Sequence, residues 1–185
     1  MKLFALYYAL MAFTIPFKNK LDKYSNTSDQ FYSNALSPEC IGQKFKKFKV
    51  ISPDGTKLSS ADLKHKVVFV CFWSVDSSRS VAEIPGFNEM YHKLRNNSDF
   101  LFVSITYDSD AKIQRAVAQN EIGYKVYHLN YNECVKLNLG HGFPSSFVLD
   151  KEGKIKNYYK GGMEDKNDSQ KETLSIIYPE ILSLF

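Results

Sequence analysis

The chain has 185 residues, of which 44% are hydrophobic and 24% charged, proportions that are ordinary for a soluble globular protein with one core. Its formal net charge of +4 comes mostly from lysines spread along the chain, so charge alone does not indicate a nucleic-acid-binding surface. The three cysteines, Cys40, Cys71 and Cys134, form neither a C-x-x-C pair nor a metal-ligand spacing. This excludes a disulfide scaffold, and we expect neither a metal site nor a cofactor.

The amino-terminal residues form an apolar stretch from Leu3 to Phe17 that only Thr14 interrupts. Its length suits the core of a signal peptide and is short for a membrane span. No clear small-x-small cleavage site follows, and the three lysines between residues 18 and 23 oppose translocation. We expect residues 1–19 to be a signal peptide or membrane anchor of an exported, periplasmic or membrane-tethered protein. The alternative is a cytoplasmic protein with an apolar amino-terminal helix.

Residues 20–38 are rich in Ser, Asn, Asp and Tyr, a composition typical of a linker, so the expected domain spans residues 39–185. At its start, apolar residues interleave with lysines, namely Phe45, Phe48, Val50 and Ile51 with Lys44, Lys46, Lys47 and Lys49. We interpret this pattern as a strand with a solvated face, and we expect no nucleic-acid partner. Pro53–Gly55 then predicts the turn of a β-hairpin.

The stretch from Val67 to Trp73 is apolar throughout and predicts a central strand that is buried on both faces. Cys71 lies inside it and is therefore expected to be an inert core thiol. The polar residues that follow predict the start of a helix. Ser80 with Glu83 fits a capping box, and Asp76 or Ser77 is a candidate cap one turn earlier. Ser77 is thus expected at the positive end of a helix dipole.

The rest of the chain continues the alternation of strands and helices. Patterns predict strands at 100–105 and 126–129, with a helix opening at Asp108 or Ser109 and ending at Gly123, and another helix at 132–139. Crossovers of this length imply parallel pairing. A strand after Pro144, a hairpin into residues 155–159 and a closing helix at 169–184, bent by Pro179, complete the pattern.

Two separated motifs resemble the TlpA/ResA-type thioredoxin-like proteins. That family reads F-W-A-x-W-C-x-x-C-x-x-E-x-P at its active site, and the positions that match are Phe72, Trp73, Glu83 and Pro85. Its second motif reads G-x-P-T-x-F-x-x-D with a cis proline, and the positions that match are Gly142, Pro144, Phe147 and Asp150. The resemblance runs from about Ile41 to the carboxyl terminus. It implies an α/β thioredoxin-like fold, a central mixed sheet flanked by helices, with an amino-terminal β-hairpin extension.

The same resemblance places serines where the family has its catalytic cysteines, at Ser77 and Ser80, and Asp76 where it has a second tryptophan. In the family one thiolate attacks a disulfide and the second cysteine resolves the mixed disulfide. A serine hydroxyl can do neither, so we expect no catalytic residues and no thiol-disulfide exchange at this site. The sequence also lacks the P-x-x-x-T-x-x-C motif of peroxidases.

Other roles for these serines are open. Helix capping is the ordinary role of serine at such positions. A sharper hypothesis makes Ser77 a nucleophile with His141 as its base, although a third orienting group is not evident. Glu83 resembles the family glutamate that tunes proton transfer, and without a thiol its expected role is a supporting one, the capping of Ser80.

The remaining expected function is binding. Trp73, Asp76, Phe143 and Pro144 are the candidate binding residues, although a tryptophan that ends a buried strand is more often core. A cis-proline loop leaves the main chain of Phe143 able to pair with an extended protein or peptide partner. The alternative is an active envelope thiol-disulfide oxidoreductase, with its cysteines replaced by engineering or with a thiol supplied by Cys40 or Cys134, which could also pair with each other.

Overall fold

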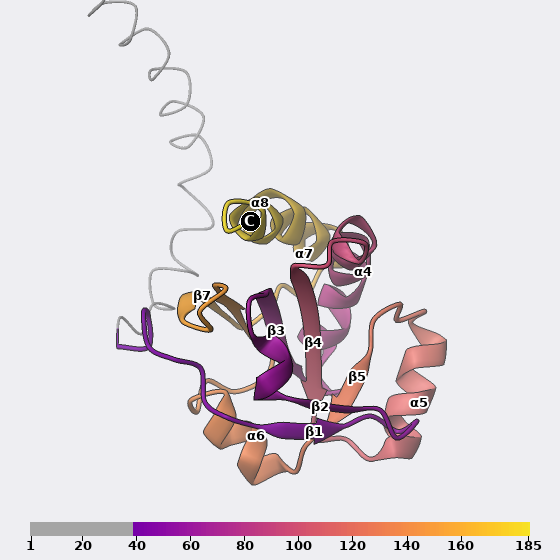
Figure 1. Cartoon of the computed structure of the whole chain (residues 1–185). Helices are drawn as coiled ribbons and strands as arrows, with labels where there is room; N and C mark the ends of the chain where they lie inside the picture. The colour runs from indigo at the N-terminus through magenta and orange to yellow at the C-terminus, as the bar shows by residue number, and fades with distance from the viewer. Residues whose placement is uncertain (1–38) are drawn as a thin grey trace, which may run out of the picture. The chain divides into compact units, whose positions relative to one another are not determined.

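A seven-stranded mixed sheet organises residues 39–185, the part of the chain that the computed structural model describes (Figure 1). The strand order is β2-β1-β5-β4-β3-β6-β7. The strands are β1 (Lys49–Ile51), β2 (Lys57–Ser59), β3 (Val67–Trp73), β4 (Phe100–Thr106), β5 (Val126–His128), β6 (Ser145–Leu149) and β7 (Ile155–Lys160). The helices are η1 (Ser60–Leu63), α4 (Ser78–Leu94), α5 (Asp110–Gln119), α6 (Tyr131–Leu137), α7 (Lys166–Glu172), η2 (Thr173–Ile177) and α8 (Tyr178–Leu182).

Strand β3 is the interior strand that the apolar run predicts, because all seven of its residues are buried. It pairs in parallel with β4, which pairs in parallel with β5, while β6 runs antiparallel on the other side of β3. Strands β1 and β2 form the antiparallel hairpin at one edge of the sheet. The expected α/β fold with a mixed sheet and an amino-terminal hairpin is therefore confirmed.

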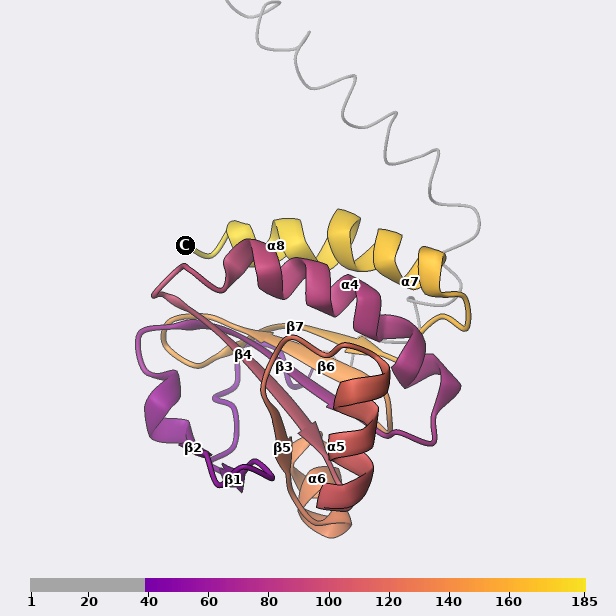
Figure 2. The same ribbon diagram turned by 90° about the vertical axis from the view of Figure 1, so that its right-hand side faces the viewer.

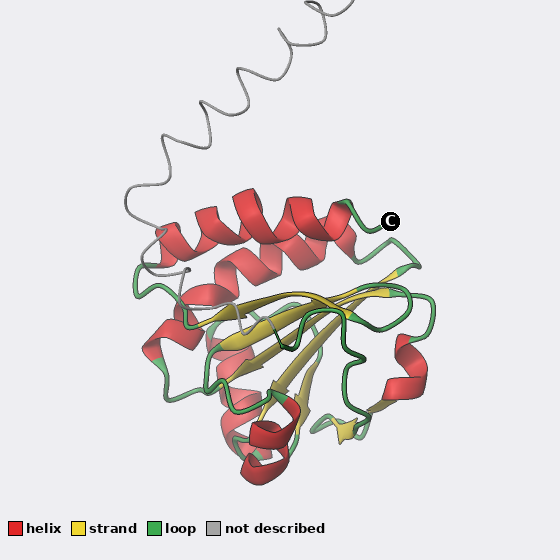
Figure 3. Ribbon diagram, turned by 90° about the vertical axis from the view of Figure 1, so that its left-hand side faces the viewer, coloured by secondary structure: helices red, strands yellow, loops and turns green. Residues whose placement is uncertain are grey.

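The side chains of β3 alternate between two cores, one on each face of the sheet. On one face Phe69 contacts Phe87 of α4, with 5.1 Å between ring centroids. On the other face Val70 and Phe72 share a core with the hairpin and with Leu137 of α6. Helices therefore cover both faces of the sheet (Figure 3).

Helix α4 and the carboxyl-terminal helices lie side by side over the sheet (Figure 2). Their close approach depends on Gly86, where a Cβ atom would lie 2.8 Å from the Thr173 hydroxyl oxygen. The closing helix begins at Lys166, earlier than expected, and widens into a π-helical turn at Thr173–Ile177. The π-turn ends two residues before Pro179, which lacks an N–H, so the widened turn occurs where the regular α-helical ladder loses a donor.

The expected signal or anchor segment (1–19) and linker (20–38) lie outside the described residues. Within residues 39–185, no helix is long and apolar enough to cross a membrane.

Candidate functional site

The register of the sheet brings the two sequence motifs to one edge. Phe72, near the end of β3, pairs with Ser145 at the start of β6, directly after Pro144. On the other side of β3, Trp73 pairs with Thr106 at the end of β4. Three loops therefore lie at the same end of the strands, namely the loop that carries Ser77, the loop after β4 and the proline loop. Sites of α/β proteins commonly form at the carboxyl ends of the parallel strands.

Ser77 is the amino-terminal cap of α4. Its backbone is extended, and its hydroxyl oxygen accepts a hydrogen bond from the Ser80 N–H at 3.3 Å. The helix begins at Ser78, so Ser80 lies inside the first turn. The capping box of Ser80 with Glu83 is therefore wrong, because the N–H of Ser80 is itself one of the donors that the cap satisfies.

The two serines in the cysteine positions differ in exposure. Ser77 is partly exposed, whereas Ser80 is only 1% exposed. The Ser80 hydroxyl oxygen accepts a hydrogen bond from the Ser74 N–H at 3.4 Å. Both oxygens thus accept hydrogen bonds from main-chain N–H groups of their own turn, as expected for structural hydroxyls.

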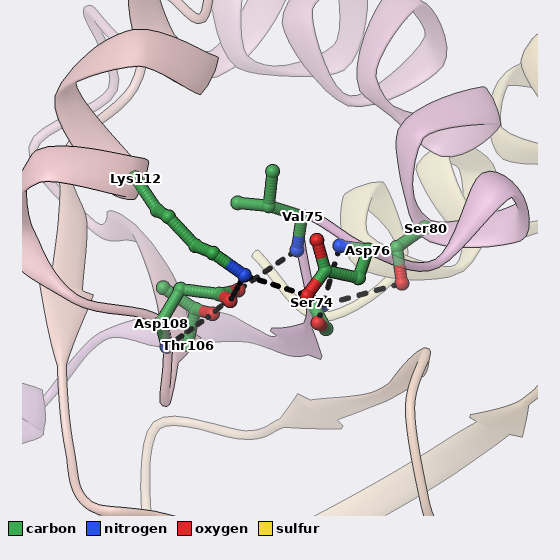
Figure 4. Close-up of polar contacts among 7 residues, drawn as sticks. All are labelled: Ser74, Val75, Asp76, Ser80, Thr106, Asp108 and Lys112. Carbon is green, nitrogen blue, oxygen red and sulfur yellow. Dashed lines mark hydrogen bonds and ion pairs between the residues drawn. The ribbon is translucent and has the colours of Figure 1, made fainter.

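Asp108, in the loop between β4 and α5, holds the loop that carries Ser77 (Figure 4). The sequence predicts only a possible helix cap at this residue. Its carboxylate is 4% exposed and accepts hydrogen bonds from the Val75 N–H at 2.8 Å and the Thr106 hydroxyl at 2.7 Å. The helix cap is instead Ser109. The signal in the sequence is an aspartate two residues after a buried strand, but its partner Val75 lies 33 residues away.

Two exposed ion pairs border the same loop. The Lys112 ammonium lies 2.7 Å from the Asp76 carboxylate, and Arg79 lies 3.2 Å from Glu164. Asp76, a candidate binding residue, is therefore accessible but already paired. Exposed pairs of this kind contribute little to stability because water screens them.

Trp73 lies in the core and not on the surface. The residue is 3% exposed, and its indole N–H donates to the Ser104 hydroxyl at 2.8 Å. Because this hydrogen bond satisfies the indole N–H inside the protein, Trp73 is a core residue and not part of a binding surface. Glu83 is partly buried beneath Gly162, and burial raises the pKa of its carboxyl well above the usual range.

The proline loop has a cis peptide bond between Phe143 and Pro144. Pro144 is buried and its carbonyl accepts from the Gly161 N–H at 2.9 Å, while the Gly142 carbonyl accepts from Asn138 at 2.9 Å. Phe143 differs. Within the described residues, its main-chain N–H and C=O make no hydrogen bond, and its side chain is partly exposed.

His141 is not placed as a base for Ser77. Its ring packs on Tyr158 of β7, with 4.1 Å between ring centroids, and faces Phe147 at 6.2 Å. Burial, helped by Lys160, lowers the pKa of His141. Nothing in the described part of the chain joins it to Ser77, so the nucleophile hypothesis gains no support.

The cysteines are buried, with 5% exposure or less for Cys40, Cys71 and Cys134. Burial raises the thiol pKa of Cys71 and, to about 12, that of Cys134. Cys134 is a thiol that donates to the Leu129 carbonyl at 3.4 Å. Thiolates are the reactive form, so Cys71 and Cys134 are poor nucleophiles. Among residues 39–185 no cluster of ligands is placed to hold a metal ion.

Comparison with known proteins gives the family of this fold and site. The model of the AhpC/TSA family matches residues 41–158, which include both loops. The chain belongs to this family. It is 28% identical over 139 residues to the thiol-disulfide oxidoreductase ResA of Bacillus thuringiensis subsp. konkukian, covering 75% of this chain and 79% of that protein.

Solved structures show the same fold. One, from Chlorobium tepidum, is assigned as a thiol:disulfide interchange protein DsbE; it covers 78% of this chain and 96% of its own, with a TM-score of 0.67 and 21% identity. A thiol:disulfide interchange protein of the thioredoxin family from Chlorobium tepidum TLS covers 72% and 94%, with a TM-score of 0.59 and 24% identity. These likenesses show the fold. Together with the family match and the similarity to ResA, they identify the chain as a TlpA/ResA-type thioredoxin-like protein.

Proposed function

We propose that this protein uses an oxidoreductase scaffold to bind a protein or peptide partner and does not exchange disulfides at the family site. The observation that carries the proposal is the pair of hydroxyls at Ser77 and Ser80, each an acceptor for main-chain N–H groups of the β3–α4 turn. A hydroxyl at this position forms no disulfide and is not ionised near neutral pH. The scaffold is thus present without its electron-carrying pair.

The proline loop supports the binding half of the proposal. Phe143 offers a main-chain N–H and C=O that make no hydrogen bond within the described residues, and its ring is partly exposed. An extended segment of a partner can satisfy these groups by strand addition, in which main-chain bonds supply affinity and side chains supply specificity. We propose the surface formed by Asp76, Ser77, Phe143 and the Pro144 turn as the place of contact.

The alternative, an active oxidoreductase that uses other thiols, meets a physical obstacle. Cys134 lies in the core and its pKa is raised to about 12, so it carries almost no thiolate near neutral pH. Cys71 is 2% exposed and its pKa is also raised.

We further propose export, on the basis of the apolar stretch at Leu3–Phe17, and fractionation of the native protein with sequencing of its amino terminus tests this.

Reduction of insulin by dithiothreitol, followed by turbidity, tests the inactive site. We expect the natural chain to give the same rate as buffer alone. Catalysis that persists in the variant Ser77→Ala with Ser80→Ala would show that another thiol works, and loss of that activity in Cys40→Ser or Cys134→Ser would identify it. Either result would overturn the proposal.

A further inference from the structure

Two consecutive glycines after β7 contact both the proline loop and helix α4. They are Gly161 and Gly162, which we call the glycine turn. The N–H of Gly161 donates to the Pro144 carbonyl at 2.9 Å. A Cβ atom at Gly162 would lie 2.9 Å from the Glu83 carboxylate oxygen Oε1, so the main chain of the turn lies directly against this side chain. One residue of the glycine turn thus contacts the proline loop, and the next contacts α4.

The local geometry requires glycine at both positions. Gly161 has a φ of 73°, in the left-handed region that glycine adopts at little cost. The Cβ position at Gly162 also lies 3.1 Å from the Arg79 carbonyl oxygen, so a larger residue would displace the Glu83 carboxylate or the main chain of α4. Two residues later, Glu164 pairs with the Arg79 side chain at 3.2 Å. The glycine turn is therefore held close to the first two turns of α4.

Glu83 has no charged partner within the described residues. Burial raises the pKa of its carboxyl. The titratable groups that interact with it electrostatically are the Cys71 thiol of β3 and the Tyr124 hydroxyl, which precedes β5. Burial raises the pKa of both, so they remain neutral while Glu83 ionises. On the side of the glycine turn, the nearby charges of Arg79 and Glu164 neutralise each other.

Ionisation changes which hydrogen bonds the Glu83 carboxyl can make. A protonated carboxyl is neutral and can donate to an acceptor, whereas a carboxylate only accepts and needs donors when it is buried. The N–H of Gly162 makes no hydrogen bond within the described residues and is therefore a donor available to the carboxylate. A glycine turn that moves to donate this hydrogen bond also moves Gly161, and with it the contact to Pro144.

We propose that ionisation of Glu83 moves the glycine turn and thereby changes the conformation of the proline loop. This inference concerns regulation of the proposed contact surface and rests on the proposed function for that role. In the protonated form, Gly161 holds the Pro144 carbonyl as described. In the ionised form, the N–H of Gly162 binds the carboxylate, the hydrogen bond to Pro144 weakens, and the main chain of Phe143 takes a different position. The proton is exchanged with water, and no thiol takes part.

Nuclear magnetic resonance of the full chain, without a partner, tests this coupling. The carboxyl carbon of Glu83 follows its ionisation, and the amide signals of Gly161, Gly162 and Phe143 follow the turn and the loop from about pH 5 to about pH 9. We expect the four signals to change with one common midpoint, above the ordinary glutamate pKa of about 4.3. Glu83→Gln is isosteric and neutral, and it is expected to remove this step from all three amides.

Two other groups that can titrate in this range require controls. Burial raises the pKa of Glu172 to about 7, and His141 lies two residues before Phe143. The variants His141→Gln and Glu172→Gln are each expected to leave the common midpoint of Glu83 and Phe143 unchanged.

The inference is overturned by a Phe143 amide that does not change with pH, or by a step that persists in Glu83→Gln. A step at Phe143 that Gly161 and Gly162 do not share would also overturn it, because the coupling would not pass through the glycine turn. Loss of the step in His141→Gln would assign it to the imidazole, with the same consequence. Because no partner is present, each of these failures leaves the proposed function standing, and the insulin assay is independent of them.

Discussion

The β3–α4 loop and the proline loop lie at the same end of the sheet, and they differ in whether their main-chain polar groups are hydrogen-bonded within the protein. In the β3–α4 loop, the N–H groups of Ser74, Val75 and Ser80 donate to side-chain oxygens within the protein. In the proline loop, the main chain of Phe143 makes no hydrogen bond within the described residues, and its ring joins an exposed patch. The first loop is satisfied internally, and the second has groups left for a partner. Under the proposed function, the β3–α4 loop is therefore structural and the proline loop is the place of contact.

The largest effect is expected from Asp108→Ala, which removes the carboxylate that holds the β3–α4 loop. The change leaves the Val75 N–H and Thr106 hydroxyl without their acceptor. We expect the free energy of unfolding to fall by about 3 kcal/mol, the scale of hydrogen bonds to a buried charged group. Urea unfolding measures this, with the exposed Asp76→Ala as the control, for which about 1 kcal/mol or less is expected. Similar losses in the two variants would show that the loop is not held by Asp108.

A pH-dependent effect is expected at Glu83 of α4, whose carboxylate lies against Gly162. Burial raises the pKa of Glu83 in the folded state above its value in the unfolded chain. At a pH between these two pKa values, the folded state binds more protons at Glu83 than the unfolded chain does. The contribution of Glu83 to the free energy of unfolding is therefore fully present below the unfolded pKa and is lost as pH rises through the folded pKa. The slope reaches at most about 1.4 kcal/mol per pH unit.

Urea unfolding between pH 4 and pH 8 is therefore expected to show a smaller loss for Glu83→Gln than for the natural chain. The exposed Glu121→Gln serves as the control and should follow the natural curve. Parallel curves for Glu83→Gln and the natural chain would show that the carboxyl is not desolvated in the fold.

A smaller effect is expected from Ser77→Ala, because the cap is lost but water can reach the partly exposed turn. The expected loss is about 1 kcal/mol. Ser78→Ala, one residue further and exposed, is the matched control and should change the free energy of unfolding by less than about 0.5 kcal/mol. A neutral Ser77→Ala would contradict the capping role.

The smallest effect on stability is expected from Tyr131→Ala, because Tyr131 is 55% exposed. The change removes a ring contact with Tyr107 but places a better helix former at the first residue of α6. We expect these effects to offset within about 0.5 kcal/mol in thermal or urea unfolding. A loss above about 2 kcal/mol would mean that the rings of Tyr107, Tyr131 and Phe143 are a part of the core and not a surface for a partner.

Local patterns predicted most of the fold. The apolar run at Val67–Trp73 depends on nearby residues, so the sequence alone was sufficient for that strand. For the start of α4 the sequence left Asp76, Ser77 and Ser80 as candidate caps, and the structure has Ser77. The role of Asp108 and the meeting of Tyr107, Tyr131 and Phe143 depend on strand register between distant segments, which periodicity does not encode. The expectation of Trp73 as a binding residue is wrong, because the residue is 3% exposed and its indole N–H donates to Ser104 on another strand, a partner that local pattern does not reveal.

The account depends most on oxygen standing at the two positions where a thiol pair would act. Restoring sulfur with Ser77→Cys and Ser80→Cys, at a helix end that favours thiolates, should create a reversible intramolecular disulfide. The measurement is the insulin reduction rate of this double variant beside the natural chain. The account predicts buffer-level activity for the natural chain and clear catalysis for the variant. Equal activity of the two chains would contradict it.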